Sequence, residues 1–178
     1  GQDCLEMKAL HDPDETVPDE ELTRAMTPFS QKPGDVTALR NRLQDVMWED
    51  VGVMRDADGL QRGLKRIAEI DDELSSVGVA ADNLAFNLSW HDWLNLRSLI
   101  DMSMVIAKAA LSRENSRGAH FREDFPDAGA MQESYFTLAS GYGDAISVTR
   151  APVQFTIVKP GETLLGEDEA ETLIKAAQ

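Results

Sequence analysis

Apolar residues recur every three or four positions in the segment that follows Asp35. The repeat comprises Val36, Leu39, Leu43, Val46, Met47, Val51 and Met54. This spacing places the apolar side chains on one face of an α-helix, and Asp35 stands where an N-cap belongs. The pattern therefore predicts an amphipathic helix from Asp35 toward Met54. Gly52 indicates that this helix ends nearby or that another backbone packs closely against it.

Two further helices are predicted between residues 60 and 113. The second follows the turn-like sequence DADG and repeats Leu60, Leu64, Ile67 and Leu74. The third runs from Trp90 to Arg113, with Ser89 as its N-cap. Because the third helix is apolar around more than half of its circumference, we expect it to be covered on two sides. Short connections between the three helices favour antiparallel packing.

The pattern changes after Pro126. SYFTLAS (134–140) and AISVTR (145–150) flank the turn-rich GYGD, and PVQFTIV (152–158) follows. Their β-branched and aromatic residues predict two or three short strands, and the glycine-rich turn predicts a hairpin. The predicted fold class is therefore mainly α, a three-helix antiparallel bundle with a small C-terminal β appendage.

The predicted organisation has three parts. Residues 1–34 form an acidic leader with room for a short helix that ends near Met26. Residues 35–126 form the helical bundle. Residues 127–178 form the hairpin-like appendage and an acidic tail, which the charge and polarity of the last residues predict to be solvated.

Composition limits the functions that this chain can have. Of its net charge of −15, residues 1–22 carry −7 and residues 160–178 carry −4. No basic face is available for phosphate groups, which disfavours nucleic-acid binding.

No apolar run reaches the roughly 18–20 residues of a membrane span, so no membrane-spanning helix is expected. The single cysteine, Cys4, forms no internal disulfide, which favours a reducing, intracellular setting.

The densest cluster of reactive side chains lies in the stretch SRGAHFREDFP. Its Arg117, His120 and Arg122 could bind an anion, since the guanidinium fork suits carboxylates and phosphates. Alternatively, Glu123 and Asp124 are internal partners of the arginines, and the stretch stops the third helix as a charged latch. Cations are favoured at the negative end of a helix, and these residue types favour the latch over the site.

No other motif points to a reaction. Neither glycine-rich phosphate-binding pattern, GxGxxG or GxxxxGK[ST], is present. The cysteine and the three histidines are too scattered for a zinc site. HDPDE at 11–15 is predicted to be a solvated loop. SWHDW at 89–93 is predicted to be a helix start whose tryptophans pack on a neighbour, with an aromatic ligand platform as the alternative. We therefore predict no catalytic, cofactor-binding or metal-binding residue.

Two long stretches match the pattern of a known family. LQDVMWEDVGVMRDADGLQRGLKRI (43–67) and LNLRSLIDMSMVIAKAALSRENSRGAHFREDFP (94–126) follow, in order, the pattern MW-x-x-VG-x-x-R, L-x-L-x-N-L and RGAH-x-R-x-DFP with two departures. They resemble the C-terminal domain of the succinate dehydrogenase/fumarate reductase flavoprotein family, which also includes L-aspartate oxidase and adenylylsulfate reductase. Asn115 stands where the family usually has glutamate, and Ser98 where it usually has asparagine.

The resemblance implies a spectrin-repeat-like bundle that follows an FAD-binding domain and a capping domain. FAD and the groups that bind a dicarboxylate would belong to those upstream domains, so this chain would hold no cofactor and would be inactive alone. Arg117, His120 and Arg122 would contact the flavin domain. An iron–sulfur subunit is a further candidate partner. The location implied is cytoplasmic, with the inner face of the membrane as a candidate peripheral site.

The first residue, Gly1 in place of methionine, suggests a piece excised from a longer protein. An excised domain should expose an apolar face where its partner was, and we expect this face on the third helix near Met102, Met104 and Val105. A free-standing helical protein-interaction module, with its acidic ends as docking tails, is the alternative.

Overall fold

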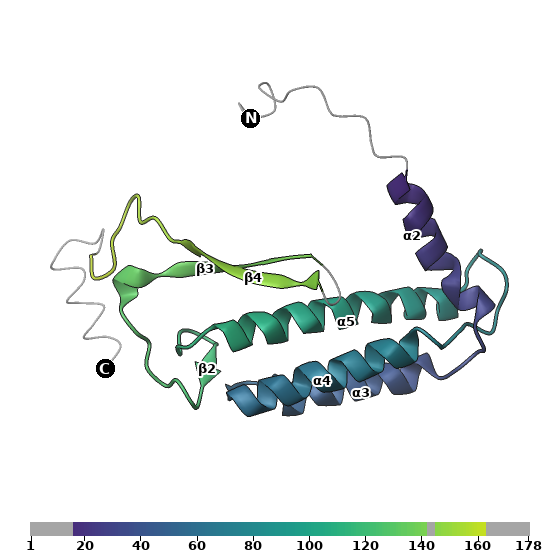
Figure 1. The fold of residues 1–178 in the computed structure, drawn as a ribbon, viewed down its shortest axis with the longest axis horizontal. Coiled ribbons are helices and arrows are strands. Elements are labelled where there is room, and N and C mark those ends of the chain that lie inside the picture. Colours follow the sequence, from purple (N-terminus) through teal and green to yellow (C-terminus); the bar gives the residue numbers. More distant parts are fainter. Residues whose placement is uncertain (1–15, 142–144, 163–178) are drawn as a thin grey trace, which may run out of the picture.

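The computed structural model describes residues 16–141 and 145–162, which are mainly helical with a small strand part toward the C-terminus. The predictions for Cys4, His11 and the acidic tail concern residues outside these ranges. Figure 1 shows the elements. The α-helices are α2 (Thr16–Met26), α3 (Val36–Glu49), α4 (Ala57–Leu74) and α5 (Leu88–Ser112), and the 3-10 helices are η1 (Thr27–Ser30) and η2 (Met131–Glu133). The strands are β1 (Met54–Arg55), β2 (Phe121–Arg122), β3 (Tyr135–Ser140) and β4 (Ser147–Pro152).

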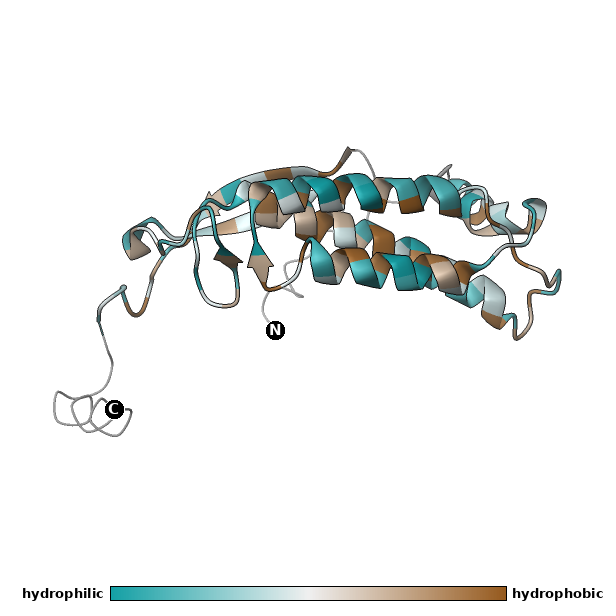
Figure 2. Cartoon of the chain, turned by 90° about the horizontal axis from the view of Figure 1, so that it is seen from below, coloured by the Kyte–Doolittle hydropathy of each residue, from teal (hydrophilic) through white to brown (hydrophobic). Residues whose placement is uncertain are grey.

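Helices α3, α4 and α5 lie side by side and enclose one apolar core. Figure 2 shows apolar residues gathered between the helices and polar residues on their outer surfaces. The helices supply this core through residues three and four positions apart, as predicted. Its buried members include Leu39, Leu43 and Val46 of α3, Leu60, Ile67, Ile70 and Leu74 of α4, and Trp93, Leu96, Ile100 and Met104 of α5.

Helix α3 begins where the sequence predicts but ends earlier. The Asp35 side chain caps it by accepting a hydrogen bond from the Ala38 backbone N–H at 2.9 Å. The helix ends at Glu49, so the prediction that it continues toward Met54 is wrong. A Cβ atom at Gly52 would lie 2.4 Å from a carbonyl oxygen of the preceding helical turn, and the chain bends away there. The helix therefore ends near Gly52, one of the two predicted alternatives.

Helices α4 and α5 both begin earlier than predicted. DADG is the N-cap and first turn of α4 rather than a separate turn, because the Asp56 side chain accepts the Gly59 backbone N–H at 2.6 Å. The N-cap of α5 is Asn87, and the prediction of Ser89 is wrong. Asn87 caps the helix and also donates to two carbonyls of the preceding loop, so one buried amide fixes both the loop and the helix start.

The tryptophans of SWHDW hold the chain that precedes α3. Trp90 donates its indole N–H to the Ala25 carbonyl at 2.8 Å and packs edge-on against Phe29, with the ring centroids 5.3 Å apart. Trp93 is buried and donates to the Val77 carbonyl at 2.8 Å. The packing interpretation of this motif is therefore confirmed, since both rings and both polar tips have internal partners.

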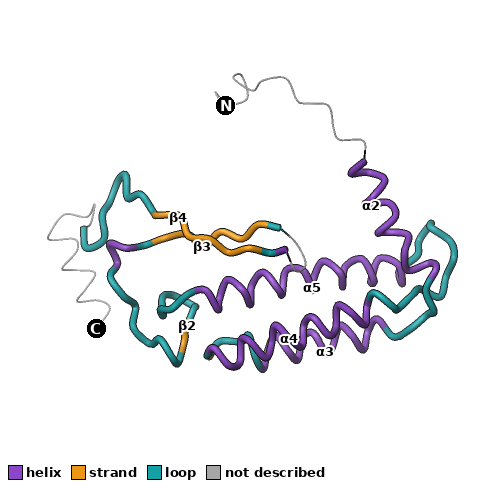
Figure 3. The backbone as a smooth tube through the Cα atoms, in the orientation of Figure 1, coloured by secondary structure: helices purple, strands orange, loops and turns teal. Residues whose placement is uncertain are grey.

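Strands β3 and β4 form the predicted antiparallel hairpin, with Tyr135 opposite Pro152. PVQFTIV contributes only Pro152 to a strand, so two strands form here among the described residues. The hairpin lies alongside α5 (Figure 3). Ile146 attaches it by entering the core, and its carbonyl accepts a hydrogen bond from Lys108 at 3.3 Å. The last three residues of GYGD lie outside the described residues.

The exposed apolar face of α5 differs from the predicted one. Met102 is 56% exposed, as expected, but Met104 is buried and Val105 packs against the core, so the prediction is wrong for these two residues. The exposed apolar residues are Leu99, Met102 and Ile106, which are three and four positions apart and so share one side of the helix.

Replacing Gly78 by alanine should destabilise the fold. A Cβ atom there would lie 2.2 Å from the Gln31 carbonyl oxygen and 2.5 Å from the Pro28 carbonyl oxygen, and backbone atoms cannot move aside cheaply. We expect the free energy of unfolding, measured by urea denaturation, to fall by about 1–3 kcal/mol. Gly34→Ala is the control, because its methyl would meet only the flexible side chain of Val77, at 3.1 Å. Equal losses in the two variants would contradict the steric argument.

Candidate functional site

Two segments that are distant in sequence meet where α3 ends and α4 begins. Strands β1 and β2 pair in parallel, with Met54 opposite Phe121 and Arg55 opposite Arg122. The Glu123 backbone N–H extends the ladder by donating to the Arg55 carbonyl at 2.7 Å. Side chains alternate along the strands, so both arginines point inward and both apolar residues point outward. This ladder, which the sequence did not predict, places SRGAHFREDFP against the end of α3.

Arg122 is a buried cation, with only 1% of its surface exposed. Its Nη1 donates to three carbonyls of the last turn of α5 at 3.1–3.2 Å, those of Ala110, Leu111 and Arg113. Such carbonyls have no partner within the helix and need one from elsewhere. Nε and Nη2 donate to the two carboxylate oxygens of Asp124, each at 2.6 Å. The planar guanidinium therefore closes the end of α5 and forms a bidentate ion pair at once.

Asp124 extends this contact to the next helix. Its Oδ2 also accepts the Ala57 backbone N–H, the first of α4, at 3.0 Å. The hydrogen bonds from Arg122 lower the pKa of Asp124 to about 2, and the Ala57 N–H acts in the same direction. The carboxylate in turn raises the pKa of Arg122. A cation thus meets the negative end of α5 and an anion meets the positive end of α4, which stabilises both helix ends.

His120 lies beneath β1, with 8% of its surface exposed. Its Nδ1 is 2.8 Å from Nη1 of Arg55, whose Nε donates to the carbonyls of Val51 and Gly52 at 3.0 and 2.7 Å. Since a guanidinium can only donate, Nδ1 is the acceptor and the proton of the neutral ring is on Nε2. Nε2 is buried and has no hydrogen-bond partner within the described part of the chain.

The charges around His120 keep its ring neutral. Burial lowers the pKa of His120 to about 4, assisted by the positive charges of Arg113, Arg55 and Arg122, while a backbone contact with Arg113 acts in the opposite direction. Burial and the charge of Arg113 also lower the pKa of Arg55. A general acid or base works best when its pKa lies near the ambient pH. At neutral pH His120 therefore serves as a hydrogen-bond acceptor rather than as a proton carrier.

Arg117 fastens the stretch to the chain that leads to the hairpin. Its Nη1 donates to the Ser134 hydroxyl at 3.0 Å and its Nη2 to the Ala130 carbonyl at 2.7 Å. The backbone N–H of Arg117 donates to the His120 carbonyl at 2.9 Å and closes a tight turn. Gly118 has a φ of +59° within that turn, a conformation that glycine adopts without strain.

The structure brings Arg117, His120 and Arg122 into one turn, but each of them serves a separate internal contact. Asp124, rather than Glu123, is the partner of Arg122. The guanidinium groups do not converge on a common space, and that of Arg122 is buried, so they do not form the anion site that was the alternative to the latch. The contacts support the latch. Sequence reasoning missed Arg55, which was marked only as the last residue of MW-x-x-VG-x-x-R.

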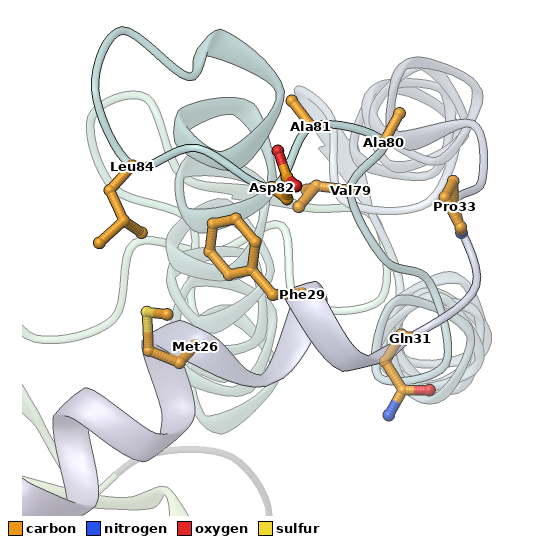
Figure 4. Close-up of a pocket in the computed structure, with 9 residues that line it drawn as sticks. All are labelled: Met26, Phe29, Gln31, Pro33, Val79, Ala80, Ala81, Asp82 and Leu84. Atoms are coloured by element: carbon orange, nitrogen blue, oxygen red, sulfur yellow. The ribbon is translucent and has the colours of Figure 1, made fainter.

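Hollows also occur elsewhere among the described residues. One of about 410 Å³ lies between η1 and the loop after α4, and Figure 4 shows Met26, Phe29 and Leu84 on one side of it. Asp82 is the charged residue among those that line this hollow, whereas ligand sites usually combine several convergent polar groups. Within 16–141 and 145–162, no three His, Cys, Asp or Glu residues are placed to hold a metal ion. In the same ranges, no helix has the length and apolar character that crossing a membrane requires.

Known proteins share both this sequence and this fold. The family model "Fumarate reductase flavoprotein C-term" matches residues 40–164. The fumarate reductase flavoprotein subunit of Mycobacterium tuberculosis is 27% identical over 146 residues, which cover 82% of this chain and 25% of that protein. L-aspartate oxidase 1 of Ralstonia nicotianae is 38% identical over 86 residues, 48% of this chain and 15% of that protein. Sdh1 of Mycobacterium smegmatis superposes with a TM-score of 0.72 at 29% identity, over 84% of this chain and 26% of that one.

The fold and the latch define a mainly helical domain that carries a charged closure at one end. The chain belongs to the C-terminal family of fumarate reductase and succinate dehydrogenase flavoproteins, so the predicted resemblance is confirmed. It spans a quarter or less of the length of the curated relatives that it matches.

Replacing Arg122 by lysine should weaken the latch. Lysine keeps the charge but lacks the fork that reaches three carbonyls and two carboxylate oxygens together. We expect the free energy of unfolding to fall by about 2–4 kcal/mol in denaturant titrations. Arg150→Lys is the matched control. Arg150 also donates to a carbonyl at the end of α5, that of Ser112, but is exposed, so its loss should stay below about 1 kcal/mol. Similar losses would contradict the special role of Arg122.

The neutral ring of His120 should make the fold sensitive to acid. In the unfolded chain a histidine takes up a proton near pH 6.5, whereas in the fold His120 does so only near pH 4. Protons therefore favour the unfolded chain in this window, and stability falls as the pH drops from about 6.5 to about 4. His120→Asn, which stays neutral and offers an acceptor to Arg55, should flatten this dependence in thermal-melt measurements.

The exposed His91 provides the control for this pH dependence, because His91→Asn should leave the slope unchanged. The Asp124 ion pair also loses stability in acid, progressively from about pH 5 downward, because the pKa of this carboxyl falls to about 2 in the fold. The slopes of the variants are therefore compared above about pH 5. An identical slope for His120→Asn and the unsubstituted chain would show that the ring does not set the acid sensitivity.

Proposed function

We propose that this chain is the C-terminal helical domain of an FAD-dependent oxidoreductase that acts on a dicarboxylate of the succinate/fumarate type. In this proposal it packs against the flavin domain of the same polypeptide and is not catalytic by itself. The observation that carries the proposal is the family match over residues 40–164, together with relatives that are flavoprotein subunits, of which the aligned residues make up a quarter or less.

We also propose that residues 35–126 form a three-helix antiparallel bundle of the spectrin-repeat type, between a leader at 1–34 and the appendage and tail at 127–178. Contacts between helix ends support the antiparallel order. Asp50 at the end of α3 pairs with Arg62 near the start of α4, at 2.7 Å, and Arg97 in the first half of α5 pairs with Asp71 near the end of α4.

The turn that carries Arg117, His120 and Arg122 is proposed to face the flavin domain. Its tip, at Gly118 and Ala119, is exposed, while the three predicted residues fix the shape of the turn through their internal contacts. Arg122 would act only by holding the turn, since its own surface is buried. The turn thereby presents a rigid backbone to whatever lies next to it.

The full-length protein is proposed to hold FAD in its upstream FAD-binding domain, covered by the capping domain, and an iron–sulfur subunit is a candidate partner. We place the protein in the cytoplasm, with a peripheral position on the inner face of the membrane for an assembled complex. These proposals rest on the family to which the chain belongs and not on any particular residue of the chain.

Flavin retention tests the proposal directly. The polypeptide encoded by the full reading frame that contains this sequence should keep FAD through gel filtration, as measured by its flavin absorbance, and should oxidise succinate or reduce fumarate. The 178-residue chain mixed with FAD should emerge without flavin. A full-length polypeptide without flavin, or stoichiometric flavin on the 178-residue chain, would contradict the proposal.

A further inference from the structure

The tryptophan of the family motif MW-x-x-VG-x-x-R, Trp48, has no evident structural role within the described residues. Val51 is buried in the core, the backbone bends at Gly52, and Arg55 binds His120 and two carbonyls. Trp48, by contrast, is 80% exposed, and its indole N–H has no partner among the described residues. The large apolar ring system of tryptophan loses free energy when it stays in water, which points to a contact outside this chain.

Trp48 belongs to a larger apolar surface. It lines a hollow of about 480 Å³ together with Glu49, Val53 and Met54, and Met54 is 65% exposed. Met54 lies opposite Phe121 in the β1–β2 ladder, so the exposed ring of Phe121 continues the surface onto the turn that carries the latch. We name the four residues Trp48, Val53, Met54 and Phe121 the end patch.

We infer that the end patch is the surface through which this chain contacts the flavin-bearing part of its own polypeptide. This inference rests on the proposed function and deepens it, because it assigns the contact to apolar residues rather than to the charged trio. The arginines of the trio are occupied by internal partners, whereas all four residues of the patch are exposed. An interface of stable character needs an apolar centre, which the patch supplies and the latch does not.

Position favours the end patch over the other exposed apolar stripe. Leu99, Met102 and Ile106 lie along α5, away from the turn at residues 117–122. The end patch adjoins that turn through Phe121, at the end of the bundle where β2 lies in Figure 1. The aligned residues make up a quarter or less of the relatives that this chain matches, so an intramolecular partner of sufficient size is available in them. The occupant to which we commit is therefore the upstream flavin-bearing part.

Methionine oxidation by dilute hydrogen peroxide tests the inference, because the thioether reacts in proportion to its exposure. Met54 reports on the end patch, and Met102, similarly exposed at 56%, is the internal control on α5. In the polypeptide of the full reading frame, the oxidation rate of Met54 relative to that of Met102 should fall at least about fivefold compared with the 178-residue chain. Peptide mass spectrometry measures both rates. An unchanged ratio would overturn the inference.

A second copy of the chain is the competing occupant. If it covered the patch, Met54 in the 178-residue chain would become protected as the protein concentration rises and the chain dimerises in sedimentation experiments. That result would overturn the assignment to the upstream part. A chain whose Met54 stays reactive over the same concentrations would support it.

A variant pair sharpens the test in the full-length polypeptide. Trp48→Ser should restore at least about half of the Met54 reactivity, since the patch loses its largest contact, while Leu99→Ser on α5 should not. Both residues are exposed, so both variants should fold, which circular dichroism checks. A protected Met54 in Trp48→Ser would remove Trp48 from the contact.

Flavin content separates the two proposals. A flavin-bearing polypeptide with a fully reactive Met54 overturns only this inference, whereas a flavin-free polypeptide overturns the proposed function.

Discussion

The ion pair between the buried Arg122 and the partly exposed Asp124 is the interaction on which one end of the fold depends. A helix that stops inside a structure leaves carbonyls without partners, and one that starts there leaves N–H groups without partners. The pair meets both needs, because Arg122 binds the last carbonyls of α5 and Asp124 binds the first N–H of α4. The two joined helix ends determine the position of β2. Its pairing with β1 then sets the positions of Arg55 and His120.

The same interaction explains why a cluster so rich in chemical groups does not act as an active site. A buried charge is tolerated only when it is paired and hydrogen-bonded, so Arg122 and Asp124 satisfy each other and leave no capacity for a ligand. Burial, assisted by the surrounding cations, lowers the pKa of His120 to about 4, so the ring is uncharged at neutral pH. The charged and polar side chains of SRGAHFREDFP therefore serve to close the fold.

The sequence predicted what depends on local periodicity and missed what depends on distant pairing. Core residues such as Leu39 and Ile67 follow from helical spacing, and the Asp35 cap follows from its position before the repeat. The Asn87 cap did not follow, because its preference over Ser89 comes from hydrogen bonds to a preceding loop. The two-residue ladder of β1 and β2 leaves no sequence signal of its own. For that reason Arg55 was not recognised, and the choice between Glu123 and Asp124 stayed open.

The latch also determines which residues remain outside. Side chains alternate along a strand, so a ladder that turns Arg55 and Arg122 inward must turn Met54 and Phe121 outward. This end of the bundle is consequently inverted relative to an ordinary domain surface, with charges inside and apolar groups outside. Covering the outer residues with another apolar surface would recover the free energy that their exposure in water costs. The polar closure and the apolar patch are thus two consequences of one strand register.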